Sequence, residues 1–164
     1  MAAAVDTAKV SNRRALRFST IDGVLRDIDG IVAAELAGTL RQLGNWTPGQ
    51  VLGHVAAWTN YSYDGYPIKP PPWFIRIILR MKIKKYLRDG MPAGVRIPGV
   101  ENGTFATEPL STSEGAERLR RALRRLQSDE PAKYDSPAFG AMSHADRIQL
   151  NLRHAELHLS FLRY

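Results

Sequence analysis

The chain contains no cysteine and only four histidines among its 164 residues. The absence of cysteine excludes disulfide bonds, thiolate zinc sites and a cysteine nucleophile. No stretch is apolar for long enough to cross a bilayer. The opening residues Met1 to Asp6 also lack the basic region and apolar run of a signal peptide. We therefore expect a cytoplasmic protein of bacterial type.

Positive charge exceeds negative charge, with a formal net charge of +7. Such an excess is compatible with a nucleic-acid or anionic-membrane partner. The two densest basic runs are 76–88 and 118–125. In the first run Lys82 falls inside the apolar sector around Ile75 and Leu79, so the helix separates its polar and apolar sides poorly. No aromatic stacking motif accompanies the charge. Solvated helix faces explain both runs, and we expect neither nucleic acid nor a membrane as partner.

Apolar residues recur at helical spacing, whereas alternating patterns are short, so we expect helices and no strands. Thr47 and Gln50 form a capping-box pattern around Pro48, which suits a first helical position. Gly23 and Gly30 weaken the first helix by about 1 kcal/mol each. Whether residues 33–43 continue that helix or form a turn is left open. The expected helices cover about 21–32, 48–64, 73–88, 112–126 and 143–162.

We expect two regions: an N-terminal extension over residues 1–18, extended or docked, and a single domain over residues 19–164. Within the domain, residues 89–109 are rich in glycine and proline and carry no period. Loops of this length often lie over a functional pocket. Four main helices with one accessory helix, at 73–88, predict an all-α four-helix bundle with a long crossover.

His154 and His158 are four residues apart, which places both rings on one face of a helix. That face is the middle of an apolar stripe and is expected to face the core. The opposite side carries polar residues, namely Gln149, Arg153, Glu156 and Ser160. Two polar rings in a core require hydrogen-bond partners or a metal ion.

His54 lies in a comparable setting on the helix that begins at Pro48, on the same face as Trp58 and Tyr61. Three imidazoles suit zinc, nickel, iron or copper. Three protein ligands also leave coordination positions open, as in catalytic sites. The alternative is that the three rings are core histidines satisfied by hydrogen bonds. His144, the fourth histidine, is expected at the end of the bundle, on the surface.

Four further residues are candidates for substrate binding. Trp58, Tyr61 and Asn151 share faces with the histidines and would line the open side of the site. Core packing is the alternative for Trp58 and Tyr61. Arg147 lies on the stripe of His154 and would either meet an anionic substrate group or pair with an acidic residue such as Asp22 or Asp29.

Two motifs resemble those of the DinB/YfiT-like metalloenzyme superfamily, in a branch of unknown function. The first is Trp46-Thr47 followed by His54, which is similar to the Trp-Ser/Thr-x6-His signature that opens the second helix of that family. The second is the pair His154 and His158, similar to its late His-x3-His pair. The resemblance extends from about Thr20 to the C-terminal residue, and both the order and the separation of the motifs agree with it.

This resemblance implies a four-helix bundle whose three histidines hold nickel, zinc or a similar ion. It further implies a metal-dependent enzyme acting on a small molecule. Several members are thiol-dependent transferases or isomerases that use a low-molecular-weight thiol such as mycothiol, bacillithiol or glutathione, and homodimers are common. No motif in this chain identifies the thiol or the substrate, and a hydrolase is equally compatible. The alternative is a non-catalytic helical binding protein with structural histidines.

Overall fold

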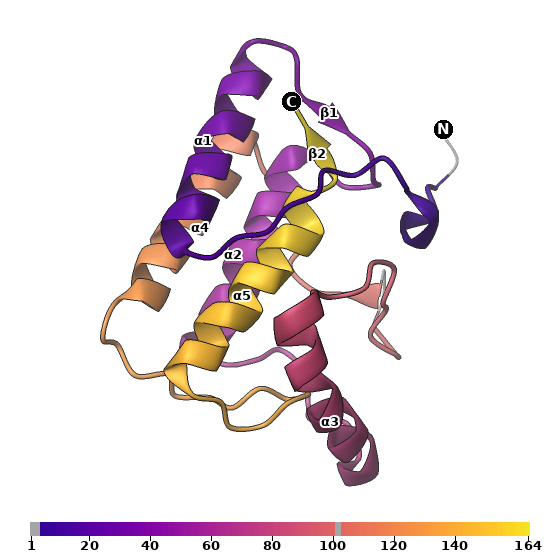
Figure 1. The fold of residues 1–164 in the computed structure, drawn as a ribbon, viewed down its shortest axis with the longest axis vertical. Coiled ribbons are helices and arrows are strands. Elements are labelled where there is room, and N and C mark those ends of the chain that lie inside the picture. Colours follow the sequence, from indigo (N-terminus) through magenta and orange to yellow (C-terminus); the bar gives the residue numbers. More distant parts are fainter. Residues whose placement is uncertain (1–3, 101–102) are drawn as a thin grey trace.

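The computed structural model describes residues 4–100 and 103–164. The expectations for 1–18 and 89–109 therefore fall partly outside the described residues. The chain is mostly helical, with one short sheet in this part (Figure 1). The elements are a 3-10 turn at Thr7–Lys9, α1 (Ile21–Leu36), β1 (Arg41–Gln42), α2 (Pro48–Asp64), α3 (Trp73–Asp89), α4 (Thr112–Gln127), α5 (His144–Leu159) and β2 (Leu162–Arg163).

Local capping chemistry determines where the helices begin. Thr47 and Gln50 make both hydrogen bonds of the predicted capping box at the start of α2. Ser111 and Glu114 do the same for α4. Thr20 and Ser143 each accept a backbone N–H at the first turn of α1 and α5. These side chains satisfy backbone donors that have no partner within the helix, which confirms the predicted starts.

Helices α1, α2, α4 and α5 lie side by side and share one hydrophobic core, whereas α3 extends away from them (Figure 1). The fully buried side chains of that core come from all four helices and include Val24, Ile28, Ile31, Leu52, Val55, Leu119, Leu126, Ala155 and Leu159. The most extensive helix–helix packing is between α2 and α4. Burial of this apolar surface is the main stabilising term of the fold.

The predicted last helix was too long, and the prediction of no strands was wrong. Helix α5 ends at Leu159 instead of continuing to Leu162. The following residues form β2, which pairs antiparallel with β1, with Arg41 opposite Arg163. The backbone N–H of Leu43 also donates to the carbonyl of Phe161 at 2.9 Å. These bonds come from a segment more than a hundred residues away, so local spacing could not reveal them.

The N-terminal segment covers the polar side of α5. The backbone N–H of Phe18 donates to the Glu156 carboxylate at 2.5 Å, and Arg153 donates to the carbonyl of Phe18. Arg153 and Glu156 also pair with each other at 3.1 Å. Arg14 forms a bidentate ion pair with Asp27 on α1, at 2.7 and 2.9 Å. Both sides of α5 are therefore occupied: the polar side by this segment and the other by α2.

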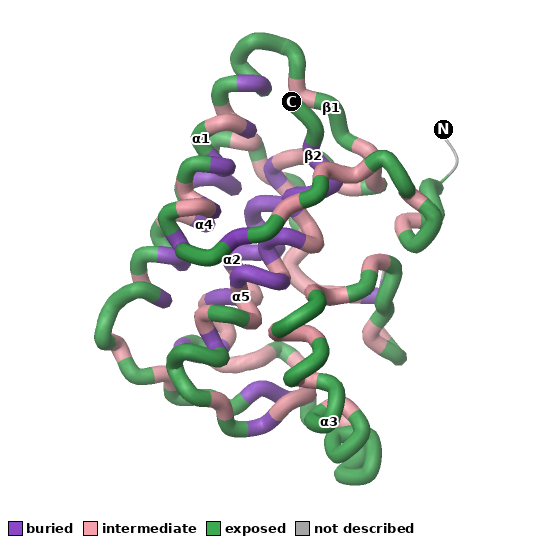
Figure 2. The backbone as a smooth tube through the Cα atoms, in the orientation of Figure 1, coloured by how far each residue is buried: buried purple, intermediate pink, exposed green. Residues whose placement is uncertain are grey.

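Helix α3 differs from the other helices because none of its residues is buried (Figure 2). It contacts the body of the protein mainly through α5. Among the described residues, none of the helices combines the length and the hydropathy that a membrane span requires. The start of α3 follows Pro72, as predicted, and its end at Asp89 lies one residue beyond the predicted one.

A close approach of α4 to the start of α2 requires glycine at position 49. A Cβ atom added to Gly49 would lie 2.1 Å from the carbonyl oxygen of Leu110, and one added to Gly115 would lie 2.6 Å from the carbonyl oxygen of Gly49. Backbone atoms cannot move aside as a flexible side chain can. The spacing between these helices therefore depends on both glycines.

We predict that Gly49→Ala lowers the free energy of unfolding by about 3 kcal/mol, because the added methyl group forces α2 and α4 apart. Urea denaturation followed by circular dichroism measures the change. Gly23→Ala is the matched control: its Cβ would meet nothing nearer than 3.4 Å. That variant should be unchanged or more stable by up to about 1 kcal/mol. Equal stability of the two variants would contradict the packing described here.

Candidate metal centre

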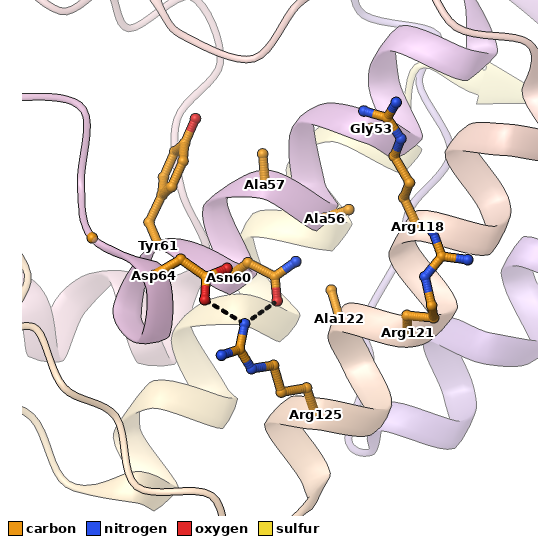
Figure 3. A pocket seen from close by; sticks show the side chains of 11 residues that line it. Gly53, Ala56, Ala57, Asn60, Tyr61, Asp64, Arg118, Arg121, Ala122 and Arg125 are labelled. Carbon is orange, nitrogen blue, oxygen red and sulfur yellow. Dashed lines mark hydrogen bonds and ion pairs between the residues drawn. The ribbon is translucent and has the colours of Figure 1, made fainter.

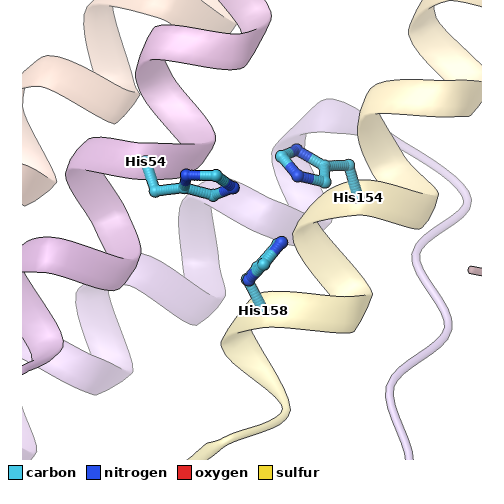
Figure 4. A group of neighbouring side chains, drawn as sticks. All are labelled: His54, His154 and His158. Carbon is cyan, nitrogen blue, oxygen red and sulfur yellow. The ribbon is translucent and has the colours of Figure 1, made fainter. Parts of the chain in front are cut away.

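The three histidines project into one space between α2 and α5 (Figure 4). His54 lies in the second turn of α2, whose start is fixed by the capping box. His154 and His158 lie one turn apart on α5. Only 2% of the surface of His54 is exposed, while His154 and His158 are partly accessible. The predicted convergence of these three side chains is therefore confirmed.

The distances between the rings suit a shared ion. One ligand nitrogen from each ring can be chosen so that all three lie within 4.8 Å of one another. The ring centroids are 5.2 Å apart for His54 and His154, and 4.5 Å apart for each of the other two pairs. Zinc–nitrogen bonds of about 2.0–2.1 Å hold two ligand nitrogens less than about 4 Å apart. Side-chain movements of about 1 Å bring this cluster to that spacing.

A backbone carbonyl fixes the tautomer of His54. Its Nδ1 lies 2.9 Å from the carbonyl oxygen of Phe105. A carbonyl only accepts hydrogen bonds, so Nδ1 carries the proton and Nε2 keeps its lone pair. Metal-binding histidines usually donate their second ring N–H in this way. The next residue, Ala106, has φ of 57°, a left-handed conformation that non-glycine residues seldom adopt and that is found preferentially at functional sites.

The loop that carries Phe105 is the glycine- and proline-rich connection between α3 and α4. Its described residues include Thr107, whose carbonyl accepts a hydrogen bond from the side chain of Gln50 at 2.8 Å. The loop is therefore attached to α2 at both His54 and Gln50. A loop of this length is expected over a functional pocket, and its described part lies beside the histidine cluster.

The environment keeps all three rings neutral at ordinary pH. Burial lowers the pKa of His54 to about 4, even though the Phe105 carbonyl and Glu108 act in the opposite direction. Burial likewise lowers the pKa of His154 and His158 well below the ordinary range, and the neighbouring histidines lower it further. Neutral imidazole is the form that binds metal ions, so protons compete weakly for this site.

Aromatic side chains surround the cluster. The Trp46 ring is stacked on His158, with a centroid distance of 5.5 Å and an angle of 12° between the rings. Trp58 lies 6.0 Å from His54 and 6.1 Å from His154. Its indole Nε1 is buried and has no hydrogen-bond partner among the described residues. The sequence indicates Trp46 only as part of the motif that precedes His54, so its place in the site was not predicted.

The remaining predicted site residues lie farther from the rings. Tyr61 packs edge-on against Trp58 at 5.4 Å and so belongs to the same aromatic group. Asn151 accepts a hydrogen bond from Thr59 at 2.9 Å and donates one to the carbonyl of Arg147 at 2.9 Å. Arg147 itself is buried and donates a long hydrogen bond, of 3.5 Å, to the carbonyl of Met142.

Asp29 on α1 and His144 on α5 both lie apart from the three predicted metal ligands. Asp29, one candidate partner for Arg147, instead forms an ion pair with Arg120 at 2.6 Å. His144, the fourth histidine, is exposed at the first position of α5, as expected. It lies outside the histidine cluster.

A separate groove of about 460 Å³ lies between α2 and α4 (Figure 3). It is lined by Tyr61 and by the arginines Arg118, Arg121 and Arg125, but by none of the three histidines. Arg125 spans one end of it and binds Asp64 at 2.7 Å. Two of the three arginines are neutralised by ion pairs, since Arg118 binds Glu108 at 3.0 Å. The groove is therefore a different surface from the candidate metal centre.

We predict that the metal-free protein loses stability as the pH falls from about 7 to about 5. In this window the unfolded chain binds protons on histidines with a pKa of about 6.5, while the folded rings stay neutral, so stability falls with the pH. For His54, whose folded pKa is about 4, the loss is about 2 kcal/mol. Urea denaturation at both pH values in the presence of a chelator measures it.

Two variants provide the comparison for that measurement. His54→Gln should show a smaller difference between the two pH values, because it removes one of the groups that bind protons only on unfolding. The exposed His144→Gln should keep the full difference. Identical pH dependence of all three proteins would refute the assignment of neutral rings in the folded protein.

Comparison with known proteins identifies the family to which the chain belongs. No curated protein and no solved structure is significantly similar to the chain. One family model does match, over residues 10–164, which includes all three histidines and nearly the whole chain. The chain belongs to that family, which is described as a protein of unknown function, DUF1569.

Proposed function

We propose that this protein is a metal-dependent enzyme of the DinB-like type that acts on a small molecule. His54, His154 and His158 are its metal ligands. The observation that carries the proposal is the convergence of three neutral imidazoles from two helices, with ligand atoms within 4.8 Å of one another. On this proposal α1, α2, α4 and α5 are the four-helix bundle of that superfamily, and α3 is the accessory helix.

The donor set supports a borderline divalent ion, with nickel or zinc as the first choices. All three donors are nitrogens, and no cysteine is available to complete a closed structural site. The hydrogen bond from His54 to Phe105 supports a ligand role, because it orients the ring and leaves Nε2 free. Three protein ligands leave positions for water or substrate.

An ion held there would supply Lewis acidity and would lower the pKa of a bound water or thiol. The side chains around it supply recognition. Trp58 offers an unpartnered indole N–H beside two of the ligands, and Tyr61 extends the aromatic wall. We assign both to substrate binding. Asn151 and Arg147 form a second layer, in which Arg147 supplies positive charge for an anionic substrate.

The reaction class follows from the open positions of the site. A thiol-dependent transferase would use a low-molecular-weight thiol as cosubstrate, whereas a hydrolase would use water at the same position.

A homodimer, expected from the DinB-like resemblance, is part of the same proposal. Analytical ultracentrifugation of the purified protein tests it directly.

We predict that protein purified without a histidine tag contains about one nickel or zinc ion per chain, as the three-ligand site requires. Elemental analysis by mass spectrometry measures the content. His154→Ala should lose the ion, because two imidazoles bind it too weakly to survive dialysis. His144→Ala, which changes a histidine outside the cluster, should retain it. Full metal content in the His154→Ala variant would remove the proposal.

We also predict that the metal has an open position for a thiol. After loading with nickel, addition of glutathione should produce a new sulfur-to-nickel charge-transfer absorption band. The same addition to His154→Ala should leave the spectrum unchanged. A nickel-loaded protein whose spectrum does not respond to several different thiols would exclude the transferase form of the proposal and leave the hydrolase.

A further inference from the structure

Helix α3 exposes a group of large apolar side chains at its N-terminal end. These are Trp73, Phe74, Ile77, Ile78 and Met81, whose exposed fractions are 72%, 53%, 53%, 53% and 77%. We call this group the α3 apolar surface. Single exposed apolar residues are normal in proteins, but a contiguous group of five usually marks an interaction site. The group lies on a helix without a single buried residue.

The protein body holds α3 mainly by its other end. The Leu87 carbonyl accepts a hydrogen bond from the Gln149 side chain at 3.3 Å, and the Arg88 carbonyl accepts one from Arg17 at 2.5 Å. Tyr86 packs edge-on against Phe139. The N-terminal half of α3 therefore extends away from the bundle (Figure 1). The α3 apolar surface lies on this half of the helix, whose residues are mostly exposed (Figure 2).

The same helix is strongly cationic. It carries six basic residues, Arg76, Arg80, Lys82, Lys84, Lys85 and Arg88, and a single acidic residue, Asp89. All six are exposed. Only Arg88, which binds Asp89 at 2.7 Å, forms an ion pair within the described part of the chain. The helix thus presents a net positive charge that the rest of the molecule does not neutralise.

Apolar and basic side chains are arranged in sequence along the outward side of α3. At about 100° per residue, the α3 apolar surface covers one sector of the helix. Lys84, Lys85 and Arg88 continue that sector toward the C-terminal end. Leu79, by contrast, is half-buried and belongs to the inward side. The sector around Leu79, from which we expected poor amphipathicity, is therefore not the one that faces outward.

We propose that α3 docks on the surface of an anionic lipid bilayer. The apolar end would enter the boundary between headgroups and acyl chains, with Trp73 at the headgroup level that indole rings prefer. The lysines and arginines would lie against anionic headgroups, which attract basic side chains near the surface. This proposal is independent of the metal centre. It concerns the surface of a bilayer and not a span across it, and it stands against the sequence-based expectation of no membrane partner until the experiment below decides between them.

The charge pattern selects this occupant over two others. A second copy of the chain related by twofold symmetry would bring the same cationic helix against itself, which opposes association. A nucleic acid would neutralise the basic residues, but its backbone would leave Ile77, Ile78 and Met81 exposed to water. An anionic bilayer satisfies both the charge and the apolar surface.

Vesicle sedimentation tests the proposal with the full-length protein. We expect binding to phosphatidylcholine vesicles that contain about one third phosphatidylglycerol, weak binding to pure phosphatidylcholine, and a blue shift of tryptophan fluorescence on binding. The double variant Phe74→Ser/Ile78→Ser should weaken binding at least about tenfold. Lys84→Glu/Lys85→Glu should abolish the preference for anionic vesicles. Leu36→Ser is the matched control: Leu36 is 85% exposed at the end of α1, and binding should not change.

Three results would overturn the proposal. The first is no binding to anionic vesicles at low salt. The second is a lipid-free dimer that Phe74→Ser/Ile78→Ser converts to monomer, which would identify a second copy as the occupant of the α3 apolar surface. The third is tight binding to duplex DNA that is unaffected by the serine variant while vesicle binding is absent, which would identify a nucleic-acid surface.

Discussion

Three neutral imidazole rings lie close together between α2 and α5, and contacts in the surrounding structure hold them in this arrangement. Desolvation disfavours their charged forms, so the rings do not repel one another as three cations would. The capping box fixes the start of α2, and the Phe105 carbonyl orients His54. On the other side, the Arg153–Glu156 pair and Phe18 hold α5 in place. Each of these contacts keeps a ring where the others can meet it.

Much of the fold could be predicted because its signals are local. Thr47, Ser111 and Ser143 act on backbone groups within their own first turns, and a spacing of four residues is enough to place His154 and His158 on one face. His54 could be added because it shares an apolar face with Trp58. What these signals cannot give is the identity of contacts between distant segments.

The features that the sequence did not predict all depend on contacts between distant segments. The strand β2 forms because β1 supplies its hydrogen bonds, and Trp46 joins the site only once α2 and α5 have come together. The partner of His54 is a main-chain carbonyl, which no residue type signals in advance. Gly30 is a further example. From the sequence it only weakens α1, but in the structure a Cβ at this position would lie 2.5 Å from the hydroxyl of Tyr164.

The segment after His158 has a role that its length does not suggest. The Phe161 N–H donates to the His158 carbonyl at 3.2 Å, and the Tyr164 hydroxyl donates to Asp27 at 2.9 Å. Asp27 is in turn bound by Arg14, which also donates to the carbonyl of Leu159. A change that lifts Tyr164 from α1 would free Asp27 and Arg14 and so loosen the last turn of α5. Tyr164, Asp27 and Arg14 lie outside the histidine cluster, but they would in this way affect the metal affinity of the proposed centre.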